Sequence, residues 1–197
     1  VARTRRVVVL ENGDLASISR EGARLIYLRT GADVRRAPTI VDWDPETAER
    51  EGFEHFMLKE IHEGPVAVRE TLRGRDSDGL RAELGTVGEK LDAFERVVFV
   101  GCGTAYHAAL IGARLVEKYA RIPAMAAVAS EFRYDDPLIG VRDLAVFISQ
   151  SGETADTMAA LKEATARGAS TLAVANVMGS SLTRESDTVL YTRAGAE

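Results

Sequence analysis

Three short segments of the sequence combine glycine with hydroxyl and amide side chains and contain no lysine or arginine. They are residues 101–105 (GCGTA), 149–154 (SQSGET) and 176–181 (NVMGSS). Backbone N–H groups and Ser/Thr hydroxyls at the start of a helix can bind a phosphate dianion. The Gln150 amide can both donate to and accept from sugar hydroxyls. This chemistry is suited to a phosphorylated sugar or polyol.

A simpler interpretation remains open for each segment taken alone. Ser151 and Ser180 could be ordinary helix N-caps, and the glycines ordinary turn residues. Three similar turns in one chain favour a shared binding edge over three unrelated caps.

The elements around these segments predict an α/β fold. Strands are predicted at 96–100, 124–129, 144–148, 171–175 and 188–191, and helices at 108–119 and 155–167. Continuous apolar strands that alternate with helices indicate a parallel sheet covered on both faces. Ligands of such sheets bind at the carboxyl ends of the strands, where all three segments begin.

The first fifty residues have a different pattern. Residues 6–10 and 15–19 flank Asn12-Gly13, which predicts a β-hairpin, and 25–28 predict another short strand. Residues 31–52 contain prolines and several acids with little periodicity, which is typical of a linker.

An amphipathic helix is predicted from about Phe53. Phe53, Phe56, Met57 and Ile61 fall on one face at helical spacing. Gly64-Pro65 is expected to interrupt this helix, with helical character resuming over 66–72.

Composition excludes several classes of protein. The 197 residues carry a net charge of −5, and eight arginines lie within residues 1–40, so the remainder is a poor general binder of nucleic acid. The single cysteine, Cys102, excludes an internal disulfide and a cysteine-based zinc site. No apolar run reaches the roughly 18 residues of a membrane span, so we expect no membrane insertion and a cytoplasmic location. Because the chain opens at Val1 without methionine, we expect an excerpt of a longer protein.

Other catalytic and binding motifs fit poorly. Gly101-x-Gly103 begins a dinucleotide fingerprint, but Tyr106 stands at its third glycine position, and the sequence contains no P-loop. Cys102 and His107 could form a nucleophilic pair, although a buried or site-lining thiol is the simpler interpretation. His55 and His62 are too far apart in sequence for a helical metal pair, so no metal site is expected.

Several segments resemble, in the same order, signatures of the glutamine–fructose-6-phosphate aminotransferase family (glucosamine-6-phosphate synthases). They are residues 53–65 (FEHFMLKEIHEGP), 101–107 (GCGTAYH), 130–134 (SEFRY), 149–156 (SQSGETAD), 176–181 (NVMGSS) and 184–187 (RESD). The serine-rich loops alone resemble the wider sugar isomerase (SIS) domain, whereas the opening helix and SEFRY are more specific. The resemblance covers the chain essentially from end to end.

This resemblance implies a domain plan and an activity. Residues 1–43 would be the C-terminal end of a glutaminase (type 2 amidotransferase) domain, 44–52 a linker, and 53–197 an incomplete first SIS lobe with a flavodoxin-like, three-layer fold. In the family, the glutaminase domain releases ammonia from glutamine. The isomerase domain then converts fructose 6-phosphate and ammonia to glucosamine 6-phosphate, the first step of hexosamine synthesis.

The resemblance also implies which residues bind the sugar phosphate. The matching positions are Thr104, Ala105, Ser149, Gln150, Ser151 and Thr154, with Gly101, Cys102, Gly103 and Gly152 shaping the loops. Many members carry serine at the position of Ala105, so one hydrogen bond of about 1 kcal/mol is expected to be missing.

No catalytic residue is expected within this segment. The family's glutaminase cysteine would precede Val1, and its isomerase glutamate, histidine and imine-forming lysine would follow Glu197. We therefore expect the segment to be inactive alone, to need no metal or organic cofactor, and to require the missing glutaminase domain and second SIS lobe. By the same resemblance the protein would be a homodimer.

Two other classes of protein carry SIS domains. A sugar-phosphate-responsive regulator needs a helix-turn-helix domain, whereas residues 1–50 predict strands and a linker. A stand-alone sugar-phosphate isomerase or deaminase requires neither these strands nor the helix from Phe53.

Overall fold

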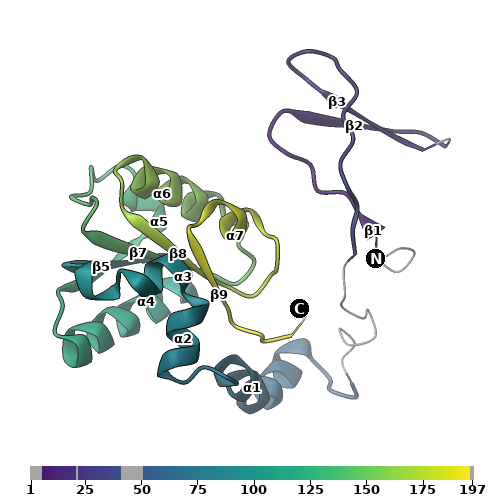
Figure 1. Ribbon diagram of the computed structural model, residues 1–197. Coiled ribbons are helices and arrows are strands. Elements are labelled where there is room, and N and C mark those ends of the chain that lie inside the picture. The colour runs from purple at the N-terminus through teal and green to yellow at the C-terminus, as the bar shows by residue number, and fades with distance from the viewer. Residues whose placement is uncertain (1–5, 21, 41–50, 196–197) are drawn as a thin grey trace. The chain divides into compact units, whose positions relative to one another are not determined.

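The computed structural model describes residues 6–20, 22–40 and 51–195, which belong to two compact units (Figure 1). The first unit includes the chain as far as Phe56, and the second runs from Met57 to Gly195. Each unit has its own strand pairing and is described separately.

The first unit contains a β-hairpin, but not the predicted one. Strand β2 (Asp14–Ile18) pairs antiparallel with β3 (Ala23–Tyr27), and the turn between them is closed by the Ser19 N–H, which donates to the Gly22 carbonyl over 2.9 Å. Asn12-Gly13 forms a turn before β2, and residues 8–10 form no strand. The predicted pairing of 6–10 with 15–19 is therefore wrong.

The partner of β1 lies far along the chain. Strand β1 (Arg6–Val7) pairs antiparallel with β4 (Thr39–Ile40), inside the segment predicted as a linker. A turn motif such as Asn12-Gly13 indicates pairing only between the strands on either side of it. The sequence pattern therefore could not show that β4 is the partner of β1. Most of the predicted 44–52 linker lies outside the described residues.

Helix α1 (Phe56–Leu72) is continuous through Pro65, so the predicted interruption is wrong. A proline inside a helix removes one backbone N–H donor. The other backbone hydrogen bonds of α1 are enough to keep the helix continuous. The apolar face predicted for this helix is largely exposed: Phe56, Met57 and Ile61 are 55%, 72% and 64% accessible, whereas Lys59 is buried.

The second unit is built on a five-stranded parallel sheet, as predicted. Its strands are β5 (Arg96–Gly101), β6 (Ala124–Val128), β7 (Asp143–Ser149), β8 (Ser170–Ala175) and β9 (Thr188–Tyr191). Their order across the sheet is β6-β5-β7-β8-β9, and every neighbouring pair is parallel. This order is that of flavodoxin-like folds.

Helices cover both faces of this sheet, which gives three layers (Figure 1). They are α2 (Ser77–Glu83), α3 (Gly85–Glu89), α4 (Thr104–Leu115), α5 (Ala129–Phe132), α6 (Ala155–Ala166) and α7 (Ser181–Glu185), with a 3₁₀ turn at Leu91–Ala93 and a π-helical turn at Val116–Ala120. Helix α4 begins four residues earlier than predicted. Thr104 and Ala105 therefore belong to its first turn.

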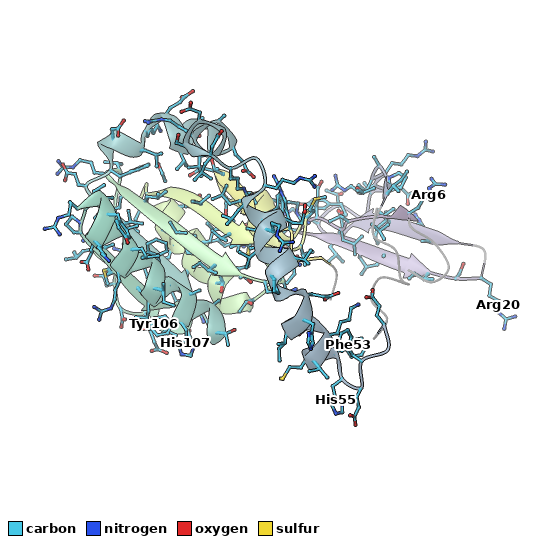
Figure 2. All side chains as sticks on the ribbon, turned by 90° about the horizontal axis from the view of Figure 1, so that it is seen from below. Arg6, Arg20, Phe53, His55, Tyr106 and His107 are labelled. Carbon is cyan, nitrogen blue, oxygen red and sulfur yellow. The ribbon has the colours of Figure 1, made fainter. Side chains whose placement is uncertain are left out.

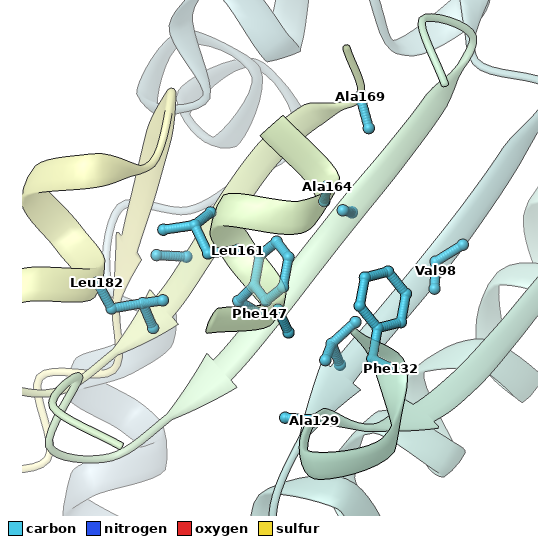
Figure 3. Close-up of a cluster of buried hydrophobic side chains, with 12 residues drawn as sticks. Val98, Ala129, Phe132, Phe147, Leu161, Ala164, Ala169 and Leu182 are labelled. Carbon is cyan, nitrogen blue, oxygen red and sulfur yellow. The ribbon is translucent and has the colours of Figure 1, made fainter. Parts of the chain in front are cut away.

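Two apolar clusters form the core, one on each face of the sheet. Alternate residues of β5 and β7 point to opposite faces: Val98 and Phe147 join one cluster, and Val97 and Val146 join the other. The first cluster packs under α5, α6 and α7, where Leu161 and Leu182 close it (Figure 3). The rigid sheet fixes the positions of the loops at its carboxyl edge.

Among residues 6–20, 22–40 and 51–195, no helix is long and apolar enough to cross a membrane.

Candidate functional site

The order of strands reverses between β5 and β7, which locates the crevice where parallel sheets bind ligands. Strand β5 lies between β6 and β7, so the chain turns to one side after β5 and later continues on the other. Gly101 at the end of β5 is the register partner of Ile148 in β7. The loops that follow these two strands therefore begin side by side.

The first loop leads directly into α4. Gly101 packs tightly on this helix, because a Cβ atom there would lie 2.9 Å from the Ala105 carbonyl carbon. Gly103 has a φ of 57° and precedes Thr104, the first residue of the helix. Thr104 is exposed and Ala105 is half-buried. Among the residues that the structure describes, no side chain caps the start of α4. The first N–H groups of this helix therefore face the carboxyl edge of the sheet without a side-chain acceptor.

The second loop uses its own serines to hold its shape. Ser149 is buried, and its hydroxyl accepts the Gly152 N–H over 3.0 Å and lies 3.5 Å from the Thr154 hydroxyl. The Ser151 hydroxyl accepts the Glu153 N–H over 3.2 Å. Gln150 is exposed, and Ser151 and Thr154 are half-buried. Thr154 precedes α6 and makes no capping bond to its first turn.

The third loop supports the second one rather than forming an equivalent cradle. The Leu182 N–H donates to the Gly152 carbonyl over 3.0 Å, and the Ser181 N–H donates to the Glu153 carboxylate over 2.7 Å. Ser180 is 3% exposed, and its hydroxyl bonds to that of Thr183. Ser180 stands at the N-cap position of α7, but its hydroxyl makes no capping bond. The geometry therefore favours a structural role for Ser180, although not that of an ordinary side-chain cap.

The structure thus brings the six predicted binding residues to one edge of the sheet, from two adjacent loops. Their role in binding stays a prediction. The sequence analysis missed Glu153 and Leu182 as supports of the second loop. No local sequence pattern marks them, because this contact follows from the neighbouring positions of β7 and β8 in the sheet.

The nucleophilic pair considered from the sequence is not favoured. Cys102 is half-buried and packs against the core cluster under α5, α6 and α7. His107 is exposed on α4, beside Tyr106 (Figure 2). In the described part of the chain, no three His, Cys, Asp or Glu side chains gather into a group that could hold a metal ion.

A hollow of about 570 Å³ lies at the opposite, amino end of β5 and β7. Its charged side chains neutralise one another: Arg96 forms a bidentate pair with Asp143, with contacts of 3.0 and 2.9 Å, and Arg142 pairs with Glu95. We assign no ligand to this hollow, because its arginines are already paired and the hydroxyl-rich loops lie at the carboxyl end of the strands.

Ion pairs outside these loops lower the pKa of several carboxyl groups, Glu83 and Asp14 among them. A hydrogen bond from Arg75 holds the pKa of Glu83 below its usual range, against the opposing effect of burial. Hydrogen bonds from Arg36 and from the Glu11 N–H lower the pKa of Asp14. The Arg75–Glu83 pair belongs to the second unit and the Arg36–Asp14 pair to the first.

Parallel strands in this order, with hydroxyl-rich loops and open helix N-termini at the switch point, define a flavodoxin-like domain. The chain belongs to the SIS domain family, whose model matches residues 91–197.

The resemblance to the aminotransferases is confirmed by comparison with known proteins. The chain is 47% identical over 197 residues to the glutamine–fructose-6-phosphate aminotransferase (isomerizing) of Caldanaerobacter subterraneus, and 50% identical over 198 residues to that of Symbiobacterium thermophilum. Each match covers 98% of this chain and 32% of the relative. The chain therefore spans about a third of the length of these relatives.

A solved structure supports the same relationship. The C-terminal domain of glucosamine-fructose-6-phosphate aminotransferase from Francisella tularensis matches with a TM-score of 0.67 and 38% identity, over 76% of this chain and 42% of that one.

Proposed function

We propose that this chain is the sugar-phosphate-binding part of a glutamine–fructose-6-phosphate aminotransferase, which makes glucosamine 6-phosphate from fructose 6-phosphate and glutamine. One observation carries the proposal. Helices α4 and α6 both begin at the switch point of the sheet, neither start is capped by a side chain, and hydroxyl groups lie beside both. The end-to-end similarity to these aminotransferases supports the choice of substrate.

The proposed binding mode follows from the two loops. The phosphate dianion lies between the first turns of α4 and α6, where the helix dipoles favour negative charge. The Thr104, Ser151 and Thr154 hydroxyls donate to phosphate oxygens, and charge-assisted bonds of this kind contribute about 1.5–3 kcal/mol each. Gln150 bonds a sugar hydroxyl. Ser149 acts mainly through the loop, because its hydroxyl is engaged by Gly152.

The domain plan is part of the proposal. Residues 1–43 are the end of a glutaminase domain, 44–52 a linker and 53–197 the first SIS lobe, and the remaining catalytic groups come from parts of the protein that this chain does not include. The complete enzyme is a cytoplasmic homodimer. The short length of the chain relative to the aminotransferases supports this plan.

Calorimetric titration of the 197-residue chain tests the proposal. We expect fructose 6-phosphate to bind, inorganic phosphate to bind more weakly, and fructose not to bind measurably. Thr154→Val should weaken fructose 6-phosphate binding about tenfold, since it removes one charge-assisted bond. Thr165→Val, the same substitution at the exposed far end of α6, is the matched control. Equal binding of fructose and its phosphate would contradict the proposal.

A second assay tests the expected lack of catalysis. Incubation of the chain with glutamine and fructose 6-phosphate should yield no glucosamine 6-phosphate and no glutamate. Formation of either product would overturn the assignment of the catalytic groups to other parts of the protein.

A further inference from the structure

Asn176, at the carboxyl end of β8, uses its side-chain amide to hold the segment that follows β9. Its Oδ1 accepts the Thr192 hydroxyl over 3.0 Å and the Ala194 N–H over 2.9 Å. Its Nδ2 donates to the Gly195 carbonyl over 2.7 Å. One side chain thus fixes both backbone and hydroxyl groups of residues 192–195, which we term the post-β9 segment.

The backbone of Asn176 contacts the second loop of the site. Its N–H donates to the Gln150 carbonyl over 3.0 Å. Directly after the adjacent strand β9, the Thr192 N–H donates to the carbonyl of Ala175 over 3.0 Å. Asn176 therefore stands between Gln150, a proposed sugar ligand, and the post-β9 segment.

The post-β9 segment is also fastened on its other side. The Thr71 hydroxyl donates to the Thr192 carbonyl, and Arg193 donates to the Arg73 carbonyl over 3.0 Å. Arg193 has a φ of 50°, a left-handed conformation that costs free energy for a residue other than glycine. Contacts on both sides maintain this conformation, so the loss of one side should allow the segment to relax.

We propose that Asn176 is a positioning residue that couples the post-β9 segment to the sugar-phosphate loop at Gln150. The proposal rests on the proposed function of that loop. A sugar phosphate that engages the Gln150 side chain fixes the Gln150 peptide, whose carbonyl is bonded to Asn176, and Asn176 in turn orders residues 192–195. Coupling of this kind is reciprocal, so disorder in the segment weakens sugar-phosphate binding.

Substitutions at Thr192 test the coupling without adding charge and without touching a proposed ligand residue. Thr192→Val replaces the hydroxyl by a methyl group of similar size, and Thr192→Ser restores the donor. Asn176→Ala removes all three side-chain bonds. Asn12→Ala, the same substitution at an exposed turn in the other unit, is the matched control.

Two quantities are measured on the 197-residue chain and each variant: the affinity for fructose 6-phosphate by calorimetry, and hydrogen exchange of the Ala194 N–H by NMR with and without that ligand. In the unsubstituted chain and in Thr192→Ser, the ligand should slow exchange at Ala194 about fivefold or more. Asn176→Ala should abolish this protection and weaken binding about tenfold, and Thr192→Val should weaken it about threefold. Asn12→Ala should change neither quantity.

The outcomes separate this inference from the proposed function. Protection of Ala194 by ligand that persists in Asn176→Ala and Thr192→Val, with unchanged affinity, overturns the coupling and leaves the sugar-phosphate site standing. Absence of binding to the unsubstituted chain overturns the proposed function and the coupling with it. If Asn176→Ala does not fold, the affinity and the Ala194 exchange of Thr192→Val and Thr192→Ser are compared instead. Equal values for these two variants overturn the coupling.

Discussion

The side chain of Ser180 occupies the space that a side chain at Gly152 would need. A Cβ atom at residue 152 would lie 2.0 Å from the Ser180 Oγ and 2.7 Å from its Cβ. Gly152 also has a φ of +67°, which favours glycine, and its carbonyl accepts the Leu182 N–H. The shape of the proposed phosphate loop therefore depends on glycine for two separate reasons, steric and conformational.

Gly152→Ala should both destabilise the chain and weaken binding of fructose 6-phosphate. Left-handed strain and the collision with Ser180 together should lower the free energy of unfolding by about 2–4 kcal/mol. Because the loop must shift away from Ser180, the affinity should fall at least about tenfold. Urea denaturation measures the first effect and calorimetric titration the second.

Gly179→Ala provides the matched control for this substitution. Gly179 has a φ of +71°, but an added Cβ would have nothing within 4 Å. Gly179→Ala should therefore introduce only backbone strain and lower the free energy of unfolding by about 1 kcal/mol. The affinity for fructose 6-phosphate should change by no more than about twofold. Equal effects of the two substitutions would show that the contact with Ser180 is not what requires glycine at position 152.

The sheet could be predicted because its strands are fully buried. The apolar run 144–148 lies within β7 (Asp143–Ser149), and the run 171–175 lies within β8 (Ser170–Ala175). Buried parallel strands cannot alternate with polar residues, so each run is visible without knowledge of its neighbours. The same logic placed the loops at a common edge, which the strand order confirms.

Features that depend on distant partners could not be predicted in this way. Strand β1 pairs with β4, and helix α1 continues through Pro65. Both features depend on interactions with other parts of the chain that a local sequence pattern does not show. The same holds for the third loop. Ser180 looks like the other loop serines in sequence, and only the packing of α7 on Gly152 shows that it supports the site.

The serines of the second loop should differ in what they contribute. Ser149→Ala removes the acceptor of the Gly152 N–H, leaves that group buried without its partner, and should lower stability by about 1–2 kcal/mol as well as the affinity. Ser151→Ala acts at a more accessible position and should lower the affinity for fructose 6-phosphate with little change in stability. Thermal unfolding and titration of both variants compare the two. The reverse ranking of stabilities would contradict the internal role of Ser149.

Ala105→Ser should strengthen binding. The residue lies in the first turn of α4, and a hydroxyl there can donate to the phosphate. One added hydrogen bond is worth about 1 kcal/mol, so the affinity should rise about fivefold. Titration with fructose 6-phosphate and with fructose measures the gain, which should appear only with the phosphorylated sugar. Unchanged affinity would place the phosphate away from the start of α4.

Glu83→Gln should make the second unit less sensitive to acid. Arg75 contacts both oxygens of Glu83, at 2.7 and 2.6 Å, and this hydrogen bonding lowers the pKa of Glu83 below its ordinary value near 4.5. A carboxyl group with a lowered folded-state pKa stabilises the fold fully above the unfolded value. That stabilisation is lost as the pH falls below about 4.5 and through the folded pKa.

The substitution should therefore lower stability by about 1–3 kcal/mol near pH 7 and flatten the decline of the Tm at acid pH. Asp92→Asn is the control, because its ion pair with Arg81 is far more exposed and should contribute at most about 1 kcal/mol. Thermal unfolding from about pH 7 down to about pH 3 measures both effects. Acid curves for Glu83→Gln that run parallel to those of the unsubstituted chain would mean that this pair does not link protonation to folding.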